Sequence, residues 1–296
     1  MKKILITGAN SYIGTSFEQW AIENGEDFQI DTQDMIGDDW KNADFSGYDS
    51  IFHVAGIAHA DVGKVSEEGK KLYYKVNCDL AVECAKKAKA AGAKQFIYMS
   101  SIIVYGESAP IGKTRVITKD TPVSPANFYG DSKAKAEEGL QLLNDENFKI
   151  VILRPPMIYG KGSKGNYPLL AKMAKKTPLF PAIKNQRSML YVESLCKFVS
   201  MMIAYEERGI FFPQNAEYVQ TADMVKIIAK VSEKRIFVTR WLNGVVWVLG
   251  KIPGKTSSLV NKAFGNLVYD KSLIGKYEKQ CMVCDFYESI ERTERR

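Results

Sequence analysis

The stretch Ile4-Leu5-Ile6-Thr7-Gly8-Ala9-Asn10-Ser11-Tyr12-Ile13-Gly14 decides how the first half of this chain is interpreted. Its three leading apolar residues indicate a short buried strand, and Gly8 allows a tight turn after that strand. A helical pattern follows, and Gly14 is small enough to let the helix pack closely on the strand. Strand, glycine turn and helix in this order predict the first β-α unit of an α/β domain.

The start of this predicted helix suits a dinucleotide. Backbone N–H groups exposed at a helix N-terminus can hold a pyrophosphate. Ser11 stands where the usual pattern has its middle glycine, and serine is still small enough for the phosphates to approach. An acidic residue about 20 residues further on binds the adenosine ribose in this motif. Asp34 stands at that distance, with Asp31 as the alternative, and because no arginine lies nearby to accept a 2′-phosphate the sequence favours NAD over NADP.

Strands and helices alternate through the next part of the chain. The predicted strands cover residues 28–34, 50–56, 95–99 and 148–153, and a predicted helix covers residues 72–91, with a truncated or missing strand between residues 34 and 48. This alternation predicts an α/β fold with a Rossmann-like, doubly wound parallel sheet. Ligands bind such sheets at the carboxyl ends of the strands, where Gly8, Ala55, Ser101 and Pro155 fall. We therefore expect these four residues to share a crevice.

The segment Tyr129-Gly130-Asp131-Ser132-Lys133 lies on a further predicted helix. Positions i and i+4 share one face of a helix, so the Tyr129 phenol and the Lys133 ammonium are expected side by side. A phenol has a pKa near ~10 in water, and a neighbouring cation lowers it. The pair is thus a candidate proton shuttle, although the same spacing is also common on solvated helices.

After Gly160 the alternation becomes less regular. The predicted helices cover residues 167–175, 192–205, 221–230 and 285–294, with only short strands between them. We therefore predict two domains. Residues 1–160 form a NAD-binding Rossmann domain that carries the Tyr129 helix, and residues 161–296 form a smaller, mostly helical substrate-binding lobe.

Composition narrows the class of protein. The chain has 296 residues and a formal net charge of +7 without a dense basic block, so no nucleic-acid partner is predicted. Its five cysteines are odd in number and irregularly spaced, which argues against a disulfide framework and for the reducing cytoplasm. The lone pair Cys281-Met-Val-Cys284 has no second pair and no nearby histidine, so no metal site is predicted.

No apolar run approaches the ~20 residues that span a bilayer. The nearest is Trp241-Leu-Asn-Gly-Val-Val-Trp-Val-Leu249, which lies between Arg240 and Lys251. We interpret it as a buried helix or a wall of a substrate pocket, with contact to a membrane surface as the alternative. His53 lies in a predicted buried strand and His59 just after it, and both are interpreted as structural.

Taken together, these motifs resemble the extended short-chain dehydrogenase/reductase family, in its NAD-dependent epimerase/dehydratase branch. Within that branch the chain looks most like bacterial polysaccharide-biosynthesis enzymes that act at C4 of a UDP-sugar, which are epimerases and 4-keto reductases. The segments that carry the resemblance occur in the family's order. They are Thr7-Gly-Ala-Asn-Ser-Tyr-Ile-Gly14, His53-Val-Ala-Gly56, Phe96-Ile-Tyr-Met-Ser-Ser-Ile-Ile-Val-Tyr-Gly106, Tyr129-Gly-Asp-Ser-Lys133, Leu153-Arg-Pro-Pro-Met-Ile-Tyr-Gly160 and Arg187-Ser-Met-Leu-Tyr-Val-Glu-Ser-Leu195.

The resemblance implies a role for each matching residue. Tyr129 would be the acid/base at the sugar hydroxyl, and Lys133 would lower its pKa and bind the nicotinamide ribose. Ser101 matches the serine that hydrogen-bonds the reacting oxygen. Asn166 resembles the asparagine that meets the substrate, and Arg187 matches the arginine that meets the diphosphate, for which a planar forked cation is suited.

The full set of expected cofactor contacts is Gly8, Ser11, Tyr12, Ile13, Gly14, Asp34, Ala55, Asn77, Tyr129 and Lys133. Two positions depart from the family's pattern. Ile103 stands where several relatives carry a hydroxyl, and Pro156 stands where some epimerases have a substrate-binding asparagine. The resemblance also implies a homodimer.

Two reactions and two non-enzymatic roles stay open. The same residues serve a NAD-dependent epimerase at C4 of a UDP-hexose or UDP-N-acetylhexosamine and a 4-keto-sugar-nucleotide reductase that consumes NAD(P)H. In either case hydride transfer belongs to the nicotinamide, and the protein positions the reactants and manages one proton. The other readings are a non-catalytic dinucleotide-binding protein and a membrane-surface assembly protein that acts through residues 241–249.

Overall fold

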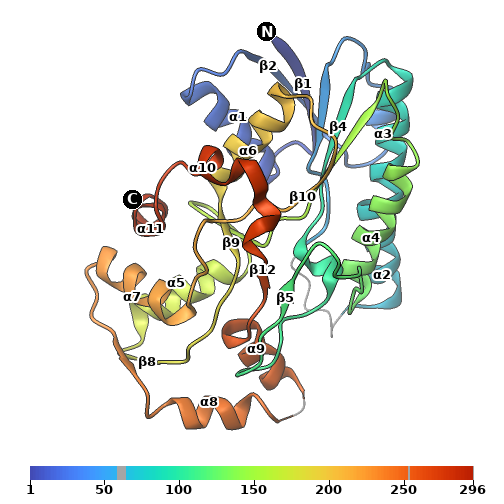
Figure 1. Cartoon of the computed structure of the whole chain (residues 1–296). Helices are drawn as coiled ribbons and strands as arrows, with labels where there is room; N and C mark the ends of the chain where they lie inside the picture. The colour runs from blue at the N-terminus through green and yellow to red at the C-terminus, as the bar shows by residue number, and fades with distance from the viewer. Residues whose placement is uncertain (59–64, 253, 296) are drawn as a thin grey trace. The chain divides into compact units, whose positions relative to one another are not determined.

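The computed structural model describes residues 1–58, 65–252 and 254–295 (Figure 1). The chain forms two compact units, each assembled from three segments. The first unit comprises Met1–Gly106, Pro122–Pro156 and Val192–Pro213, and the second comprises Glu107–Thr121, Met157–Tyr191 and Gln214–Arg296. The chain thus leaves the first unit and returns to it twice.

A six-stranded parallel sheet organises the first unit. Its strands, in spatial order, are β10 (Gly209–Phe211), β6 (Lys149–Leu153), β4 (Gln95–Met99), β3 (Ser50–His53), β1 (Lys2–Thr7) and β2 (Phe28–Gln33). The strand order reverses beside β1, which confirms the predicted α/β, doubly wound fold. Residues 34–49, all of which the structure describes, form no strand and contain only the short 3-10 helix η1 (Asp39–Lys41), as expected.

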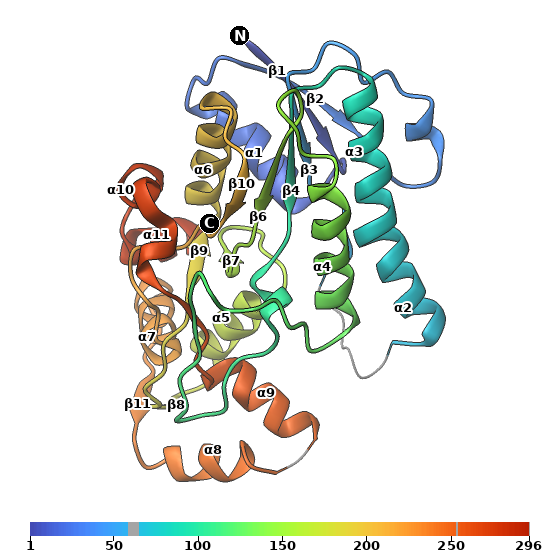
Figure 2. The same cartoon turned by 45° about the vertical axis from the view of Figure 1, so that its right-hand side comes forward.

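Helices cover both faces of this sheet (Figure 2). Helices α1 (Tyr12–Glu23) and α6 (Val192–Ala204) pack together on one face. The other face carries α2 (Glu67–Tyr74), the π-helical segment η3 (Lys75–Asp79), α3 (Leu80–Ala90) and α4 (Phe128–Gln141). A 3-10 helix, η4 (Ile102–Tyr105), follows β4.

Small residues let α3 and α4 approach the sheet closely. Ala81 and Ala85 of α3 and Ala136 of α4 are fully buried against strand residues such as Phe96 and Ile152. Strands buried on both faces need apolar side chains throughout, which explains their continuous apolar runs. This packing fixes the carboxyl ends of the strands, where the candidate site lies.

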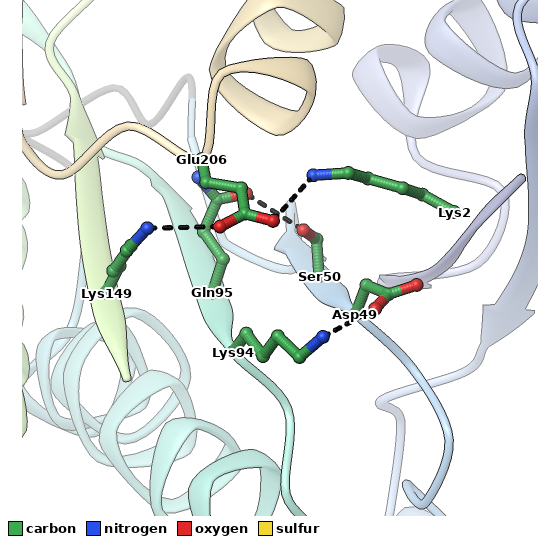
Figure 3. A pocket seen from close by; sticks show the side chains of 7 residues that line it. All are labelled: Lys2, Asp49, Ser50, Lys94, Gln95, Lys149 and Glu206. Carbon is green, nitrogen blue, oxygen red and sulfur yellow. Dashed lines mark hydrogen bonds and ion pairs between the residues drawn. The ribbon is translucent and has the colours of Figure 1, made fainter. Parts of the chain in front are cut away.

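The amino ends of the strands hold a small hollow that is closed by paired charges (Figure 3). Lys2 and Lys149 both donate to the carboxylate of Glu206, at 3.1 Å and 3.2 Å. Gln95 donates to the backbone carbonyls of Met202 and Glu207 and accepts from a serine of β3. Because these groups satisfy one another at the opposite end of the sheet from Gly8, we interpret the hollow as structural.

The second unit consists of helices and short strand pairs. Its strand pairs are β5 (Val116–Ile117) with β12 (Val268–Tyr269), β7 (Met157–Tyr159) with β9 (Met189–Tyr191), and β8 (Leu179–Pro181) with β11 (Phe237–Thr239). Its helices are α5 (Asn166–Lys176), α7 (Thr221–Val231), α8 (Asn243–Leu249), α9 (Lys255–Phe264), η5 (Lys271–Tyr277), α10 (Glu278–Cys281) and α11 (Phe286–Glu294). Tyr159 anchors its core, where the phenol hydrogen-bonds Ser289 and accepts from Asn215.

The interpretation of residues 241–249 as a buried helix is wrong, and the alternative of a pocket wall stays a prediction. Asn243–Leu249 form α8, which has no buried residue; Trp241, which precedes the helix, and Val248 are 69% and 62% exposed. The periodicity that predicted a helix was correct, but it cannot tell a core-facing apolar stripe from a solvent-facing one. Among the residues that the structure describes, no helix is long and apolar enough to cross a membrane.

Candidate active site

The turn between β1 and α1 depends on Gly8. Its φ is +119°, and a Cβ placed there would lie 2.6 Å from the backbone nitrogen of Ala55. The backbones at the carboxyl ends of β1 and β3 therefore touch, and no other residue type fits. The Ala55 N–H donates to the Thr7 carbonyl at 3.0 Å, which fixes this contact.

The start of α1 is prepared to receive an anion. Ser11 caps the helix, and its hydroxyl accepts from the Gly14 N–H at 3.1 Å. The first turn of a helix leaves its N–H groups without intrahelical acceptors, so those of Tyr12 and Ile13 remain available by geometry. A bare glycine turn followed by free N–H groups fits the pyrophosphate of a dinucleotide.

Asp34 and Asp31 occupy different environments. Thr7 pairs with Gln33 at the end of β2, so Asp34 follows directly beside Gly8, at the carboxyl end of the sheet. Its exposed carboxylate accepts from the Ile36 N–H at 3.0 Å. Asp31 lies within the strand, and its carboxylate accepts the Tyr48 hydroxyl at 2.9 Å. The geometry therefore favours Asp34 as the ribose ligand.

Asn77 joins the cofactor region to the helix of Tyr129. It is fully buried in the π-helical segment η3, and its amide oxygen accepts from the Ile57 N–H at 2.8 Å while its nitrogen donates to Ser132. A Cβ on Gly56 would lie 3.1 Å from the Asn77 oxygen and 3.2 Å from the Lys133 nitrogen. The structure thus brings Asn77 and Lys133 together beside a bare glycine. Single π-turns are frequent at functional sites, and no sequence pattern indicated this one.

Ser101 and Tyr129 meet at the end of β4. The Ser101 side chain hydrogen-bonds the Tyr129 phenol, and its oxygen also accepts from the Ile103 N–H at 3.3 Å. Gly130 makes this possible, because a Cβ there would lie 2.7 Å from the Ile103 carbonyl oxygen. Helix α4 can therefore start directly against η4, with Tyr129 facing Ser101.

The expected lowering of the Tyr129 pKa is wrong for the structure as it stands. Burial raises the pKa of Tyr129 to about 12, and the hydrogen bond from Ser101 only partly opposes this rise. Desolvation disfavours the charged phenolate, and here it outweighs the favourable contacts. The Tyr129 phenol is therefore protonated at neutral pH.

Lys133 is buried and held from several sides. Its ammonium donates to the Met99 carbonyl at 2.8 Å and lies 4.7 Å from the ring centroid of Tyr98. Burial lowers the pKa of Lys133 to about 8, and the nearby Glu137 carboxylate opposes this shift. The side chain is thus mostly a cation at pH 7, although burial disfavours its charged form.

A buried ionic network next to Lys133 was not predicted from the sequence. Glu137, one turn after Lys133 on α4, pairs with Arg154 at the end of β6 and accepts from the Ser100 hydroxyl. Arg154 also donates to the Tyr105 hydroxyl. The sequence held one indication of it. Lys133 and Glu137 are four residues apart on the predicted helix, and most residues around them are small and apolar, which is typical of a buried helix face.

His53 is a structural residue. Its Nδ1 lies 2.8 Å from the Thr7 hydroxyl, and burial lowers its pKa to about 3. An imidazole with such a low pKa is a weak base and holds a proton poorly at physiological pH. His59 lies outside the described residues. Within those residues, no three metal-ligating side chains cluster.

The two substrate candidates lie in the second unit. Asn166 is exposed at the first position of α5. Arg187 is partly buried, donates to the carbonyls of Lys262 and Gly265 at the end of α9, and has a pKa that burial lowers to about 10. These bonds use Nη1, so the edge formed by Nε and Nη2 of the guanidinium suits an anion. No hydrogen bond found between described residues links Asn166 to Arg187.

Known proteins share both sequence and fold with this chain. It is 30% identical over 295 residues to a UDP-glucose 4-epimerase of Vibrio cholerae, with 92% of this chain and 88% of the relative covered. It is 28% identical to an N-acetyl-α-D-glucosaminyl-diphospho-ditrans,octacis-undecaprenol 4-epimerase of Escherichia coli O157:H7, over 78% of this chain and 71% of that one. The crystal structure of a Bacillus cereus UDP-glucuronic acid 4-epimerase in complex with NAD superposes with a TM-score of 0.72, 18% identity and coverage of 99% and 95% of the two chains.

The family follows from the extent of these matches. A profile of the NAD dependent epimerase/dehydratase family matches residues 4–211, which include the Gly8 turn, Ser101, Tyr129 and Lys133. The match therefore covers more than half of the chain and runs through every element that builds the candidate site in the first unit. The chain belongs to the NAD-dependent epimerase/dehydratase family, of the extended short-chain dehydrogenase/reductase type.

Proposed function

We propose that the protein is a NAD-dependent epimerase that inverts C4 of a UDP-hexose or UDP-N-acetylhexosamine by transient hydride transfer. The observation that carries the proposal is the set formed by Ser101, Tyr129 and the buried Lys133 at the carboxyl ends of the strands, beside the Gly8 turn. An acid/base, its hydrogen-bonding partner and a cation next to a dinucleotide turn are the groups that such a reaction requires.

The first unit carries the residues that would hold NAD. The N–H groups of Tyr12 and Ile13 would hold the pyrophosphate, and Asp34 would bind the adenosine ribose. Asn77 and Lys133, which lie beside Gly56, would bind the nicotinamide ribose. Bound NAD supplies the site that accepts a hydride from the sugar carbon and returns it.

The side chains manage one proton. Tyr129 takes the proton of the sugar 4-hydroxyl as the carbon loses its hydride, and gives it back when the hydride returns on the other face. Ser101 holds the reacting oxygen. Because burial raises the pKa of Tyr129 to about 12, proton donation is the easier direction; the hydrogen bond with Ser101 favours proton removal, and we propose that the Lys133 cation adds to it.

The runner-up activity is a 4-keto-sugar-nucleotide reductase that consumes NAD(P)H. The same residues serve it, with Tyr129 acting only as the proton donor. The experiment that separates the two activities is incubation with UDP-glucose and UDP-N-acetylglucosamine. An epimerase gives the C4 isomer without net change in NADH absorbance, whereas steady NADH consumption with a 4-keto sugar supports the reductase.

Tyr129→Phe tests the enzyme proposal directly. Loss of the phenol should lower kcat by about 10²–10⁴-fold, the usual contribution of a positioned acid/base, with little change in NAD binding. Tyr73→Phe is the matched control, because that ring packs 6.0 Å from Tyr129 and is assigned no role. Full activity in Tyr129→Phe would show that Tyr129 is not the acid/base, whereas a wild type that binds NAD but turns over neither kind of sugar nucleotide would be a non-catalytic dinucleotide-binding protein.

A lipid-linked sugar diphosphate is the second candidate substrate. The Escherichia coli relative is named for an undecaprenol-linked sugar. The exposed apolar face beside α8 favours this candidate, since it would bring the chain to the bilayer that holds such a substrate. Turnover of a polyprenyl-diphospho-N-acetylhexosamine in detergent, compared with the UDP-sugar, distinguishes the two substrates.

We further propose that the second unit is the substrate lobe, with Asn166 at the sugar and Arg187 at the diphosphate, and that the protein is a cytoplasmic homodimer. The substitution Arg187→Met tests the proposed diphosphate contact. Arg187→Met should raise KM for a UDP-sugar much more than it lowers kcat, because a diphosphate contact is made in the ground state and the transition state alike. Sedimentation equilibrium gives the oligomeric state.

A further inference from the structure

An exposed apolar stripe runs along α8. Trp241, Val245, Val248 and Ile252 are 69%, 56%, 62% and 48% exposed. Val245 and Val248 lie three residues apart on one side of α8, and Trp241 and Ile252 lie just before and just after the helix. We call these four residues the α8 stripe. Four neighbouring large apolar side chains in solvent are unusual for a soluble surface and mark an interaction site.

The other side of α8 attaches the helix to the rest of the second unit. The Trp247 ring lies so close to Gly112 that a Cβ on that glycine would meet ring carbons at 2.2 Å. Gly250, just after α8, lies against Ile111 and Val260 in the same way, at 3.3 Å. Helix α9 packs beside α8 (Figures 1 and 2). Since one side of α8 is anchored by these contacts, the stripe on its other side faces solvent.

The chain around the stripe is basic without interruption. No Asp or Glu occurs from residue 234 to residue 269, whereas six cations do: Lys234, Arg235, Arg240, Lys251, Lys255 and Lys262. Arg240 and Lys251 flank α8 and are exposed. In the part of the chain that the structure describes, neither of them forms an ion pair with a carboxylate.

The two units differ in charge. The first unit contains 17 Lys and Arg against 23 Asp and Glu, a formal charge of −6, and the second contains 24 against 11, a formal charge of +13; together they make the 41 cations and 34 anions of the chain. The stripe therefore lies on the strongly basic unit. Such asymmetry predicts an anionic partner.

We propose that the α8 stripe and its flanking cations dock the protein on the surface of an anionic lipid bilayer. A tryptophan beside aliphatic side chains, rimmed by Lys and Arg, suits the boundary between headgroups and acyl chains. A second copy of the chain fits less well, because two stripes facing each other would bring like charges together. A nucleic acid also fits less well, because the aliphatic side chains of the stripe form no hydrogen bonds or ion pairs with phosphates or bases.

Vesicle sedimentation with the full-length chain tests this docking. The wild type should pellet with vesicles of phosphatidylcholine and phosphatidylglycerol (3:1) and much less with phosphatidylcholine alone. Trp241→Ser with Val248→Ser should lower the partition coefficient at least tenfold. Arg240→Gln with Lys251→Gln should lower it roughly fivefold per charge, and only on the anionic vesicles.

Matched controls keep the result specific. Leu142→Ser removes an 87% exposed apolar side chain from the first unit and should bind vesicles as the wild type does. Trp241→Phe should still pellet but lose the share of the quenching by brominated acyl chains that comes from Trp241; Trp20 and Trp40 are buried in the first unit, and Trp247 contributes equally to the wild type and the variant. Tyr129→Phe should bind vesicles normally, so failure of the enzymatic proposal would not be mistaken for failure of docking.

Four results would overturn the proposal. These are wild-type protein that stays in the supernatant, equal binding to neutral and anionic vesicles, a stripe variant that binds as well as the wild type, and a wild-type dimer that the stripe variant dissociates without any vesicle binding. The last result would assign the stripe to a second copy of the chain.

Discussion

Lys133 keeps its charge in a place where water cannot reach it. Its ammonium is compensated by the Met99 carbonyl, the Tyr98 ring and the Glu137 carboxylate, which in turn is held by Arg154. Breaking one member of a buried ion pair leaves an uncompensated charge and is costly, so this network fixes the position of Lys133 as well as its charge. Such a fixed cation suits the role proposed for Lys133, beside the acid/base Tyr129.

The pH dependence of stability should reveal this buried cation. Folding lowers the pKa of Lys133 from 10.5 to about 8. Between these values the unfolded chain binds a proton that the folded chain has released, so the free energy of unfolding rises with pH. Urea denaturation at pH 7, 8, 9 and 10 measures this effect. Above pH 8 the free energy of unfolding of the wild type, relative to that of Lys133→Met, should rise by up to roughly 1.4 kcal/mol per pH unit.

The same substitution at an exposed position provides the control for this titration. Lys135→Met removes a lysine of the same helix whose side chain is 54% exposed. If the free energy of unfolding of the wild type minus that of Lys133→Met stays constant or falls as the pH rises, Lys133 is not desolvated in the folded protein.

Sequence reasoning at the residue scale predicted types and spacings but not environments. It selected Ser101, Tyr129 and Lys133, and the structure places the first two in hydrogen-bonding contact. It expected a lowered pKa for Tyr129, because helical spacing shows which groups are neighbours and not how much water they lose. Glu137 and Arg154 were missed for the same reason, since only tertiary packing turns a lysine-glutamate spacing into a buried network.

At the element scale, the β1–α1 turn is the most constrained part of the site. Gly8 combines a positive φ with backbone contact to Ala55, whereas Gly25, just after α1, has φ +66° and no atom within 4 Å of a built Cβ. The two glycines thus separate the cost of a left-handed conformation from the cost of a steric clash.

Alanine at these two positions should therefore have unequal effects. Gly25→Ala should lower the free energy of unfolding by about 1 kcal/mol, the cost of a left-handed residue at the end of a helix. Gly8→Ala adds a clash with the Ala55 backbone and should cost about 3 kcal/mol or more. Urea midpoints measure both variants. Equal losses would mean that the β1 and β3 backbones separate easily, and that the turn is not a rigid cradle.

Element boundaries in the first unit followed from periodicity and glycine positions, and β2, β4, α4 and β6 lie where the sequence predicted them. The break of the 72–91 helix into α2, η3 and α3 was not predicted, because a π-turn has no sequence signature. The exposure of α8 was also missed. An amphipathic stripe is defined by its period, and the period is the same whether the stripe faces a core, a partner or water.

At the scale of the whole molecule, the chain returns to the first unit twice. The prediction with one boundary at residue 160 could not anticipate this, because β10 is a three-residue strand whose partner, β6, lies more than 50 residues earlier. A strand of three residues is too short for its apolar pattern to be recognised in the sequence. Which strand it pairs with depends on which edge of the folded sheet is still free. The roles of the two units in binding remain proposals.

Tryptophan positions allow the stability of the first unit to be followed in the intact protein. Trp20 and Trp40 are buried in the first unit, whereas Trp241 and Trp247 are exposed in the second. Unfolding of the first unit should therefore dominate the red shift of the emission spectrum on heating. Every residue proposed to hold NAD also lies in the first unit. A ligand that binds only the folded state stabilises it by mass action.

NAD at a hundred times its Kd should thus raise the free energy of unfolding by about 2.7 kcal/mol and shift this emission transition upward. NADP should shift it less at equal concentration, because its 2′-phosphate meets the exposed Asp34 carboxylate. Asp34→Asn should reduce the shift of the unfolding transition that NAD causes, and it should bring the shifts caused by NAD and NADP closer together. Asp31→Asn should leave both unchanged, since that carboxylate is bonded to Tyr48 instead. If Asp31→Asn narrows the gap and Asp34→Asn does not, the ribose is bound within β2 and the assignment of Asp34 is wrong.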